Sequence, residues 1–421
     1  MLRHVLQTNP FYQKKLGPRA ADQIKGLESL AGLPFTTKAE LLADQERHPP
    51  YGTNLTYPFS RYVRLHQTSG TATGTPLRWL DTRDSWAWFL ECWRQKYDAV
   101  EVTASDRLFF PFSFGPFIGF WAAFEAAVQR GNLTLAGGGM SSSARLRFLL
   151  DHQATIICCT PTYALRLAEV GKEEKLDLNG SPVRALIVAG EPGGSVPSTR
   201  ARIEAAWGAR VFDHSGMTEL GSCTIECVPN PLGVHVLETE FIPEVVDEVG
   251  KSVPPGVEGE LVVTNLGRWG SPVIRYRTGD RVVADPEPCP CGRPWLRLKG
   301  GIVGRADDMM VIHGNNVYPS AIENIVRRYQ EIVEFQMEVI ETPALTNLRL
   351  VLECQPAESP ARLINEIVAA VRDELNFRPE VVVVPLGTLP RSEMKSRRLI
   401  RRMKGPPHGP SEATPLPGMQ P

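Results

Sequence analysis

The sequence has almost no net charge and lacks a long apolar run. Its 46 basic and 47 acidic residues give a formal net charge of −1, so no overall electrostatic field favours nucleic acid or an anionic membrane. No apolar run approaches the roughly 20 residues that a membrane-spanning helix needs. The N-terminal stretch is interrupted at Asn9-Pro10 before it reaches the apolar length of a signal peptide. We therefore expect neither a nucleic acid nor a membrane as partner.

Cysteine is sparse. Eight cysteines scattered among 421 residues are not the density of a disulfide-stapled secreted domain, so a reducing cytoplasm is the expected location. No internal repeat is visible. What remains is an ordinary globular composition, 42% hydrophobic and 22% charged, in a chain long enough for two or three domains.

Beyond residue 130, apolar strands alternate with helical stretches. The expected strands cover 133–135, 155–159, 186–188 and 209–212, and the expected helices cover 144–153, 162–170 and 197–207. Such alternation favours a layered α/β domain with a largely parallel sheet. In sheets of this kind, ligands bind at the C-terminal ends of the strands.

The predicted fold class is α/β, with a large layered N-terminal domain over 1–303 that includes a β-rich subdomain at about 228–303. A small α+β C-terminal domain is expected over 304–404. The segment 405–421 is rich in proline and poor in apolar residues, so we expect it to be disordered.

Two polar loops follow strands. Asp213-His214-Ser215-Gly216-Met217-Thr218-Glu219 follows one strand, and Gly190-Glu191-Pro192 follows another. Gly216 lets the backbone approach a ligand, Thr218 can donate to a phosphate oxygen, and Glu219 can hold a hard cation such as magnesium. An ordinary polar turn is the alternative for the first loop taken alone.

Three further segments have two readings each. The segment 67–76 contains two glycines and five hydroxyl side chains, which suits polyphosphate or a flexible linker, but it lacks the lysine and spacing of a Walker A loop. Asp280, after Thr278-Gly279, suits a ribose diol or a simple Asx turn. The aromatic segment 109–117 suits the wall of an aryl-binding or fatty-acid pocket or a plain core.

In their order along the chain, these motifs resemble the adenylate-forming superfamily, and most closely its phenylacetate–CoA ligase branch. The resemblance covers roughly residues 5–404 and includes Tyr-Arg-Thr-Gly-Asp at 276–280, Gly-Arg-Ala-Asp-Asp at 304–308 and the late Lys395. Three positions depart from the pattern. Ala72 is one extra residue in the phosphate loop, and Thr75 stands where the superfamily usually has a basic residue. Ser215 stands where many members of the superfamily have an aromatic side chain that stacks on adenine.

The resemblance implies roles for individual residues. The nucleotide-binding residues would be Ser69, Gly70, Thr71, Thr73, Gly74, Gly190, Glu191, Pro192, Asp213, Asp280 and Arg305. Thr218, Glu219 and Lys395 would serve catalysis, with Glu219 holding Mg²⁺ and Lys395 stabilising the adenylation transition state. Asp307 would be the hinge of a mobile C-terminal domain.

The implied activity is that of an AMP-forming acid–CoA ligase. It would adenylate an aryl or arylacetic acid with ATP and Mg²⁺ and form a thioester with coenzyme A. Its partners would be a small carboxylic acid, ATP, CoA and a second copy in a homodimer. The alternatives are a stand-alone enzyme that loads a carrier protein, and a non-catalytic nucleotide-binding relative.

A zinc site is also predicted. Cys289-Pro290-Cys291-Gly292 presents two thiols on one turn, and Cys227 and His235 lie upstream in the same β-rich stretch. Three thiolates and one imidazole suit a closed, tetrahedral structural zinc, provided that folding brings the distant ligands together. Cys223 is the second choice for the place of Cys227.

Overall fold

The chain folds into two compact units. The computed structural model describes residues 1–17, 19–68, 75–341, 346–355, 360–392, 396 and 398–403. One unit comprises Met1–Asp308 with Arg391, Ser392 and Ser396, and the other comprises Met309–Pro390 with residues 398–403. The predicted Ser69, Gly70, Thr71, Thr73, Gly74, Lys395 and tail 405–421 lie outside the described residues.

A five-stranded parallel sheet lies at the centre of the first unit. Its strands are β3 (Arg107–Phe110), β4 (Leu133–Ala136), β5 (Ile156–Cys159), β6 (Ala185–Val188) and β7 (Arg210–Asp213). Their order across the sheet is β4-β3-β5-β6-β7, and all neighbours are parallel. The predicted layered α/β architecture is confirmed.

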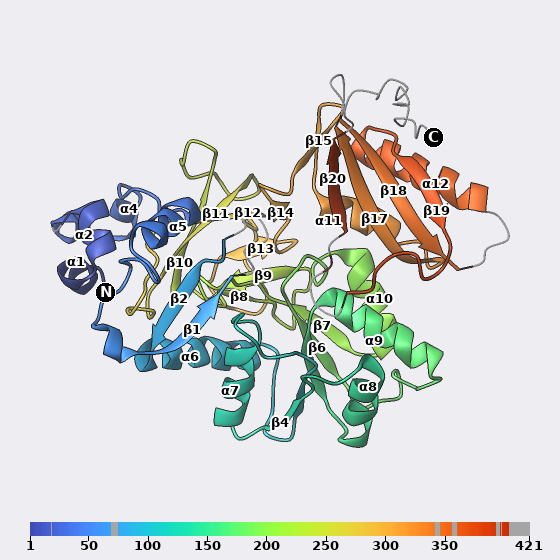
Figure 1. Cartoon of the computed structure of the whole chain (residues 1–421), viewed down its shortest axis with the longest axis horizontal. Helices are drawn as coiled ribbons and strands as arrows, with labels where there is room; N and C mark the ends of the chain where they lie inside the picture. The colour runs from blue at the N-terminus through green and yellow to red at the C-terminus, as the bar shows by residue number, and fades with distance from the viewer. Residues whose placement is uncertain are drawn as a thin grey trace, which may run out of the picture. The chain divides into compact units, whose positions relative to one another are not determined.

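Both faces of this sheet are buried. Alternate side chains of a strand point to opposite faces, and on β5 Ile156 and Cys158 belong to one apolar core while Ile157 and Cys159 belong to another. Residues of α6 (Arg83–Ala99) and α7 (Trp121–Gln129) join the first core. Residues of α8 (Ser142–Asp151), α9 (Pro161–Glu173) and α10 (Pro197–Trp207) join the second. Figure 1 shows these last three helices beside β6 and β7. The helices expected at 144–153, 162–170 and 197–207 are therefore present.

The β-rich part of this unit has two antiparallel sheets. One contains β10 (Phe241–Val246), β11 (Glu258–Asn265), β12 (Tyr276–Val283) and β14 (Gly304–Arg305), and the other contains β8 (Thr224–Ile225), β9 (Gly233–Val236) and β13 (Arg297–Lys299). The segment Thr278-Gly279-Asp280 is not a simple turn, because these residues lie within β12. Gly279 has a φ of +76° beside a register shift against β11, so this glycine forms a bulge.

The N-terminal part is mostly helical. Its elements are α1 (Leu2–Thr8), α2 (Pro10–Leu16), α3 (Ala20–Gln23), α4 (Leu27–Leu30), α5 (Lys38–Arg47), the 3₁₀ turn η1 (Phe59–Arg61), and the hairpin β1 (Tyr62–Gln67) and β2 (Arg78–Thr82). Helix α5 begins with a capping box: Thr37 accepts from Glu40 N, and the Glu40 carboxylate accepts from Thr37 N. This capping box fixes where Lys38 begins the helix.

The second unit is an α+β domain with its own core. Its sheet has the order β19-β18-β17-β20, built from β17 (Ile332–Glu341), β18 (Thr346–Cys354), β19 (Glu380–Val384) and β20 (Leu399–Met403). A hairpin of β15 (Met310–Ile312) and β16 (Asn315–Val317) and the helices α11 (Pro319–Val326) and α12 (Pro360–Leu375) complete it. The amphipathic helix α12 buries Leu363, Ile367 and Val371 in this core.

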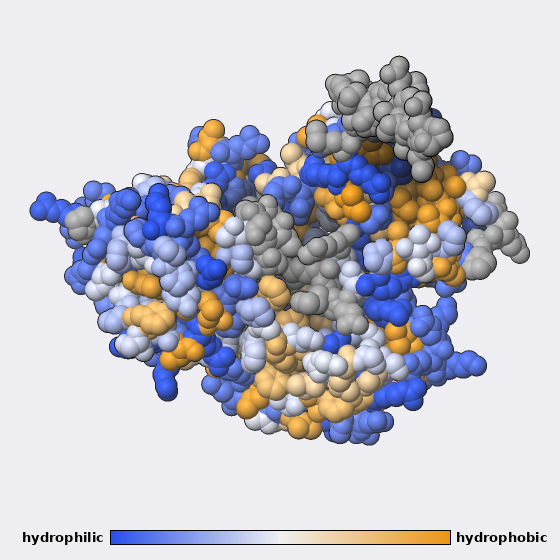
Figure 2. All heavy atoms as spheres, in the orientation of Figure 1, coloured by the Kyte–Doolittle hydropathy of each residue, from blue (hydrophilic) through white to orange (hydrophobic). Residues whose placement is uncertain are grey.

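The surface is mostly hydrophilic in the view of Figure 2, with apolar residues gathered in smaller areas. Pale and orange residues lie over the lower part of the view, where Figure 1 places α7 and β4. Val128 of α7 and Leu133 of β4 are both exposed. Among the described residues, no helix combines the length and apolarity that a membrane crossing requires.

Candidate functional site

Asp213 ends β7 in a crowded polar setting. Its carboxylate accepts from Ser195 Oγ at 2.6 Å, and its backbone N–H donates to Glu226 at 3.1 Å. A Cβ added at Gly194 would lie 2.6 Å from Asp213 Cγ. Burial raises the pKa of the Asp213 carboxyl to about 6, against the lowering effects of Ser195 and Arg200. Asp213 is thus a tightly held acceptor at a C-terminal strand end.

The turn after Asp213 is anchored from behind by Arg268. This fully buried guanidinium donates to the backbone oxygens of Thr218 and Glu219 at 2.6 and 3.0 Å, and to both carboxylate oxygens of Asp81 at 2.7 Å. Bidentate pairing of this kind fixes geometry as well as charge. Asp81 lies in β2, so the Thr218–Glu219 turn is tied to a distant hairpin. Sequence reasoning missed Arg268.

Glu219 presents a buried carboxylate to a lysine. Lys38 Nζ lies 3.2 Å from Glu219 Oε1, and the Tyr276 hydroxyl donates to the same oxygen at 3.4 Å. Only 3% of Glu219 is exposed, and a buried carboxylate of this kind needs a cation. Lys38, which was not predicted, supplies that cation, and the carboxylate is also of the charge and ligand type that suit Mg²⁺.

Asp280 and Arg305 face each other across β12 and β14. Arg305 donates from Nη1 to Asp280 Oδ1 at 3.1 Å, and from Nε and Nη2 to the two oxygens of Asp307 at 2.9 and 3.3 Å. The structure therefore brings the predicted ribose-binding pair together with the predicted hinge residue. The boundary between the compact units falls just beyond, after Asp308.

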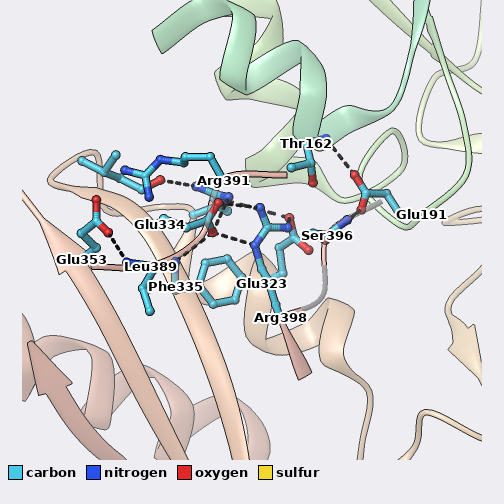
Figure 3. A network of polar contacts seen from close by, with 12 residues as sticks. Thr162, Glu191, Glu323, Glu334, Phe335, Glu353, Leu389, Arg391, Ser396 and Arg398 are labelled. Carbon is cyan, nitrogen blue, oxygen red and sulfur yellow. Dashed lines mark hydrogen bonds and ion pairs between the residues drawn. The ribbon is translucent and has the colours of Figure 1, made fainter. Parts of the chain in front are cut away.

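Glu191 follows β6 and bridges two segments. Its Oε1 accepts from Thr162 N at 2.9 Å, and its Oε2 accepts from Ser396 N and Oγ at 2.7 and 2.8 Å. Figure 3 shows Glu191 between these two residues. Gly190, at a φ of +100°, and the exposed Pro192 flank it. All three residues lie at the same sheet edge as Asp213, as predicted for C-terminal strand ends.

A buried lysine lies behind the Asp213 loop and was also missed. Lys96 is 0% exposed, and its Nζ contacts Ser222 Oγ, His214 Nδ1 at 3.3 Å and the Trp93 ring at 4.8 Å. Burial lowers the pKa of Lys96 to about 7. Because helix α6 reads as an apolar core helix, the sequence carries no signal that its lysine points inward.

The aromatic segment after β3 is largely core. Phe112 is 9% exposed in the first core, and Phe114 packs against Trp121 and Phe124. Phe120 lies 6.2 Å from the His214 ring, centroid to centroid. Phe112 and Phe114 therefore mainly fill the interior, and it is Phe120, just beyond the predicted segment and packed against Phe112, that lies beside the Asp213 loop.

The four predicted zinc ligands converge. One ligand atom each from Cys227, His235, Cys289 and Cys291 all lie within 4.8 Å of one another. Cys227 and Cys289 are 3.6 Å apart, sulfur to sulfur, and Cys291 Sγ is 3.4 Å from His235 Nε2. Ideal tetrahedral zinc bonds imply about 3.8 Å and about 3.5 Å for these separations. His235 Nδ1 lies 3.2 Å from the Trp295 carbonyl oxygen. Because a carbonyl oxygen can only accept, Nδ1 carries the proton, and Nε2 keeps its lone pair for a metal.

Comparison with known proteins decides the family. The AMP-binding enzyme family model matches residues 63–267, and the AMP-binding enzyme C-terminal domain model matches residues 314–402. A phenylacetate–coenzyme A ligase of Thermus thermophilus is 30% identical over 425 residues, which cover 95% of this chain and 94% of that protein. The chain belongs to the phenylacetate–coenzyme A ligase family of AMP-binding enzymes.

Two further relatives agree. A phenylacetate–coenzyme A ligase of Pseudomonas putida is 30% identical and covers 94% of this chain and 90% of its own length. The crystal structure of 2-hydroxyisobutyryl-CoA ligase in complex with 2-HIB-AMP superposes with a TM-score of 0.90 at 29% identity, over 95% of this chain and 86% of that one. The protein shown in Figure 1 is thus itself an AMP-forming acid–CoA ligase, and ATP and CoA are its co-substrates.

Proposed function

We propose that the acid activated by this ligase is an aryl or arylacetic acid similar to phenylacetate. The observation that supports this class is a line of aromatic side chains after β3: Phe112, of the segment 109–117, packs against Phe120, whose ring lies 6.2 Å from the ring of His214, the residue next to Asp213. An aromatic wall at the edge where the nucleotide binds suits an aryl group. The names of the two phenylacetate–coenzyme A ligases that match nearly the whole chain support the same class.

In the first half-reaction, the acid's carboxylate attacks the α-phosphate of ATP, and pyrophosphate leaves. Negative charge then concentrates on the reacting oxygens, and Lys395 offsets it. Glu219 would hold Mg²⁺, which would supply further positive charge there. Thr218 donates to a phosphate oxygen. Lys38, 3.2 Å from Glu219, supplies a further positive charge.

Nucleoside recognition falls to the carboxylates at the strand ends. Asp213 accepts from the adenine amino group, and Asp280 accepts from the ribose hydroxyls with Arg305 holding its carboxylate at 3.1 Å. Gly190, Glu191 and Pro192 form the segment beside the adenine. The phosphate loop of Ser69, Gly70, Thr71, Thr73 and Gly74 wraps the phosphates.

In the second half-reaction, the CoA thiolate attacks the acyl-adenylate carbonyl and AMP leaves. No negative charge develops on the phosphate oxygens in the way that requires Lys395 in the first half-reaction. The C-terminal domain can therefore turn about Asp307 between the two half-reactions and admit the thiol. The boundary between the compact units falls after Asp308, next to this residue, which supports the hinge.

We further propose that Cys227, His235, Cys289 and Cys291 hold a structural zinc ion. The convergence of four ligand atoms within 4.8 Å supports this, and four protein ligands leave no open position for catalysis. All eight cysteines are free thiols, and zinc-bound thiolates fit a reducing cytoplasm. A homodimer remains a prediction.

The acid class is tested by ATP–pyrophosphate exchange with a panel of aryl, arylacetic and aliphatic acids. We expect the highest kcat/KM with an arylacetic or aryl acid. A clear preference for a short aliphatic hydroxy acid, as in the name of the 2-hydroxyisobutyryl-CoA ligase, would overturn the proposed acid class. Exchange without any product from free CoA would favour the carrier-loading alternative, and well-folded protein without exchange would favour the non-catalytic one.

A further inference from the structure

A buried arginine of α10 contacts the end of β7. Arg200 is 6% exposed, and Figure 1 shows α10 beside β7. Its Nη2 donates to the Val211 carbonyl oxygen, and its Nη1 donates to Glu226 Oε2 at 2.8 Å and to the Gly194 carbonyl oxygen at 3.3 Å. Its Nε donates to Glu204 Oε1 at 3.0 Å. The planar guanidinium thus ties α10 to three other segments of the first compact unit.

Glu226 carries one of these contacts to Asp213. Its Oε2, the oxygen that Arg200 contacts, also accepts from Asp213 N at 3.1 Å, and Glu226 N donates to the Asp213 carbonyl oxygen at 2.9 Å. Burial raises the pKa of the Glu226 carboxyl to about 7, and the Arg200 guanidinium is the largest opposing influence. A buried carboxylate without its cation becomes neutral, so loss of Arg200 weakens the bond from the Asp213 N–H.

A second contact leads to the Asp213 side chain. The Gly194 carbonyl that accepts from Arg200 belongs to the peptide linking Gly194 to Ser195, and a peptide group is planar. Ser195 Oγ donates to Asp213 Oδ2 at 2.6 Å. Arg200 therefore constrains the residue that holds the Asp213 carboxylate as well as the residue that holds the Asp213 backbone.

We propose that Arg200 is a positioning residue for Asp213: through Glu226 and through the Gly194–Ser195 peptide, it holds the Asp213 carboxylate where that carboxylate meets the adenine amino group. This proposal rests on the proposed role of Asp213 in adenine recognition. Arg200 lies outside the proposed nucleotide-binding residues and acts through Asp213. Its loss should therefore affect the contact with the amino group and leave the contacts with ribose and phosphates in place.

Arg200→Met tests this directly, because methionine keeps a long side chain and removes every donor. We expect the Kd for ATP to rise by about 10-fold, since a hydrogen bond to a charged group is worth about that factor and is lost when Asp213 shifts. Purine riboside triphosphate, which lacks the 6-amino group, is the second probe. Its Kd should stay within about 2-fold of the wild-type value, so the preference for ATP over this analogue should fall by about 5-fold or more.

Arg184→Met is the matched control. Arg184 also donates to both oxygens of a carboxylate, that of Asp106, at 2.9 and 2.6 Å, and to the Glu101 carbonyl oxygen at 2.8 Å. It directly precedes β6 and therefore lies at the opposite end of the strands from Asp213. Arg184→Met should lower the free energy of unfolding and change neither Kd.

Arg200→Lys separates charge from geometry. Lysine keeps the positive charge beside Glu226 but lacks the planar fork, so we expect the preference for ATP over the analogue to fall by about 3-fold or more, in protein closer to wild-type stability than Arg200→Met. In an Asp213→Ala background, Arg200→Met should raise the Kd for ATP no further, because its effect passes through Asp213.

Each contrary outcome identifies a different error. A parallel rise in both Kd values in Arg200→Met would show a purely structural role, and two unchanged Kd values would also overturn the inference. A wild-type preference for ATP in Arg200→Lys would show that charge alone suffices. If wild type has no preference for ATP over the analogue, or if Asp213→Ala keeps that preference, the proposed role of Asp213 fails first, and that result is visible without any Arg200 variant.

Discussion

Glu191 and Ser396 are 205 positions apart in the chain, yet the Glu191 carboxylate accepts both the backbone N–H and the hydroxyl of Ser396. Glu191 lies at the sheet edge where β6 ends and Asp213 ends the next strand. Ser396 follows Lys395 directly. A residue of the proposed adenine segment is thereby linked to the residue that follows the proposed catalytic lysine in the sequence.

Lys395→Ala should abolish adenylation selectively. Loss of a positive charge at the reacting phosphate typically costs about 10²- to 10³-fold, so ATP–pyrophosphate exchange should fall by that factor. The formation of acyl-CoA from supplied acyl-adenylate should be retained. The same substitution at Lys172, which is exposed on α9, should change neither rate. Exchange at the wild-type rate in Lys395→Ala would contradict the proposed role.

Gly194→Ala should weaken ATP binding. The new Cβ would lie 2.6 Å from Asp213 Cγ, a distance that the tightly held carboxylate cannot accept without moving. We expect the Kd for ATP to rise by about 10-fold or more, because Asp213 no longer meets the adenine amino group. Gly26→Ala is the control, since no atom lies within 4 Å of its new Cβ. An unchanged Kd would argue against Asp213 as an adenine ligand.

Lys96→Met should stabilise the fold near neutral pH. The pKa of Lys96 is lowered to about 7 in the folded state, so the unfolded chain binds more protons between about pH 7 and 10.5 and wild-type stability rises with pH over that range. Methionine removes the cost of the buried charge, which gives a gain of about 1–4 kcal/mol below pH 7. The gain should shrink towards pH 10.

Urea unfolding of wild type and Lys96→Met across this pH range measures the difference. Lys172→Met, at an exposed position, should show no such trend. His214 and Ser222 contact the Lys96 ammonium. The titratable groups of Cys223, Cys92 and Asp213 raise the pKa of Lys96, against the larger lowering effect of burial. If Lys96→Met were less stable than wild type at pH 6.5, the contacts of the ammonium would outweigh the cost of burying its charge, and the prediction would be wrong.

Removal of zinc should destabilise the protein. We expect about one zinc per chain in purified protein, and Cys289→Ser should lose both the metal and thermal stability, because a structural site contributes its binding energy to folding. Cys354→Ser, in β18 and far from this cluster in sequence, should keep the metal. Metal-free protein with full thermal stability would contradict the site.

The sequence predicts the elements well where local patterns are strong. The parallel strands and their following helices come from apolar runs and caps, and Ser141, for example, caps α8. The zinc ligands are predicted because cysteine pairs on a turn are rare in cores. Periodicity alone is misleading at residues 273–277, whose pattern favours a strand that begins at Val273. Arg275 has a φ of +47° and binds Glu244 and the Ala31 carbonyl, so β12 begins only at Tyr276.

What the sequence does not predict are contacts between distant polar residues. Arg268 and Asp81 are 187 positions apart, and no local pattern marks either as a partner of the Thr218–Glu219 turn. Lys38 and Lys96 look like ordinary helical lysines, one at the start of α5 and one near the end of α6. Their roles depend on tertiary packing, which a single sequence does not show.

The most direct test of the account is a product analysis with phenylacetate, ATP and Mg²⁺, with and without CoA. Without CoA, the enzyme should exchange pyrophosphate into ATP and retain an acyl-adenylate. With CoA, it should release AMP and acyl-CoA in equal amounts. Formation of ADP and phosphate, or no reaction with any carboxylic acid in protein that binds ATP, would contradict AMP-forming acid–CoA ligation.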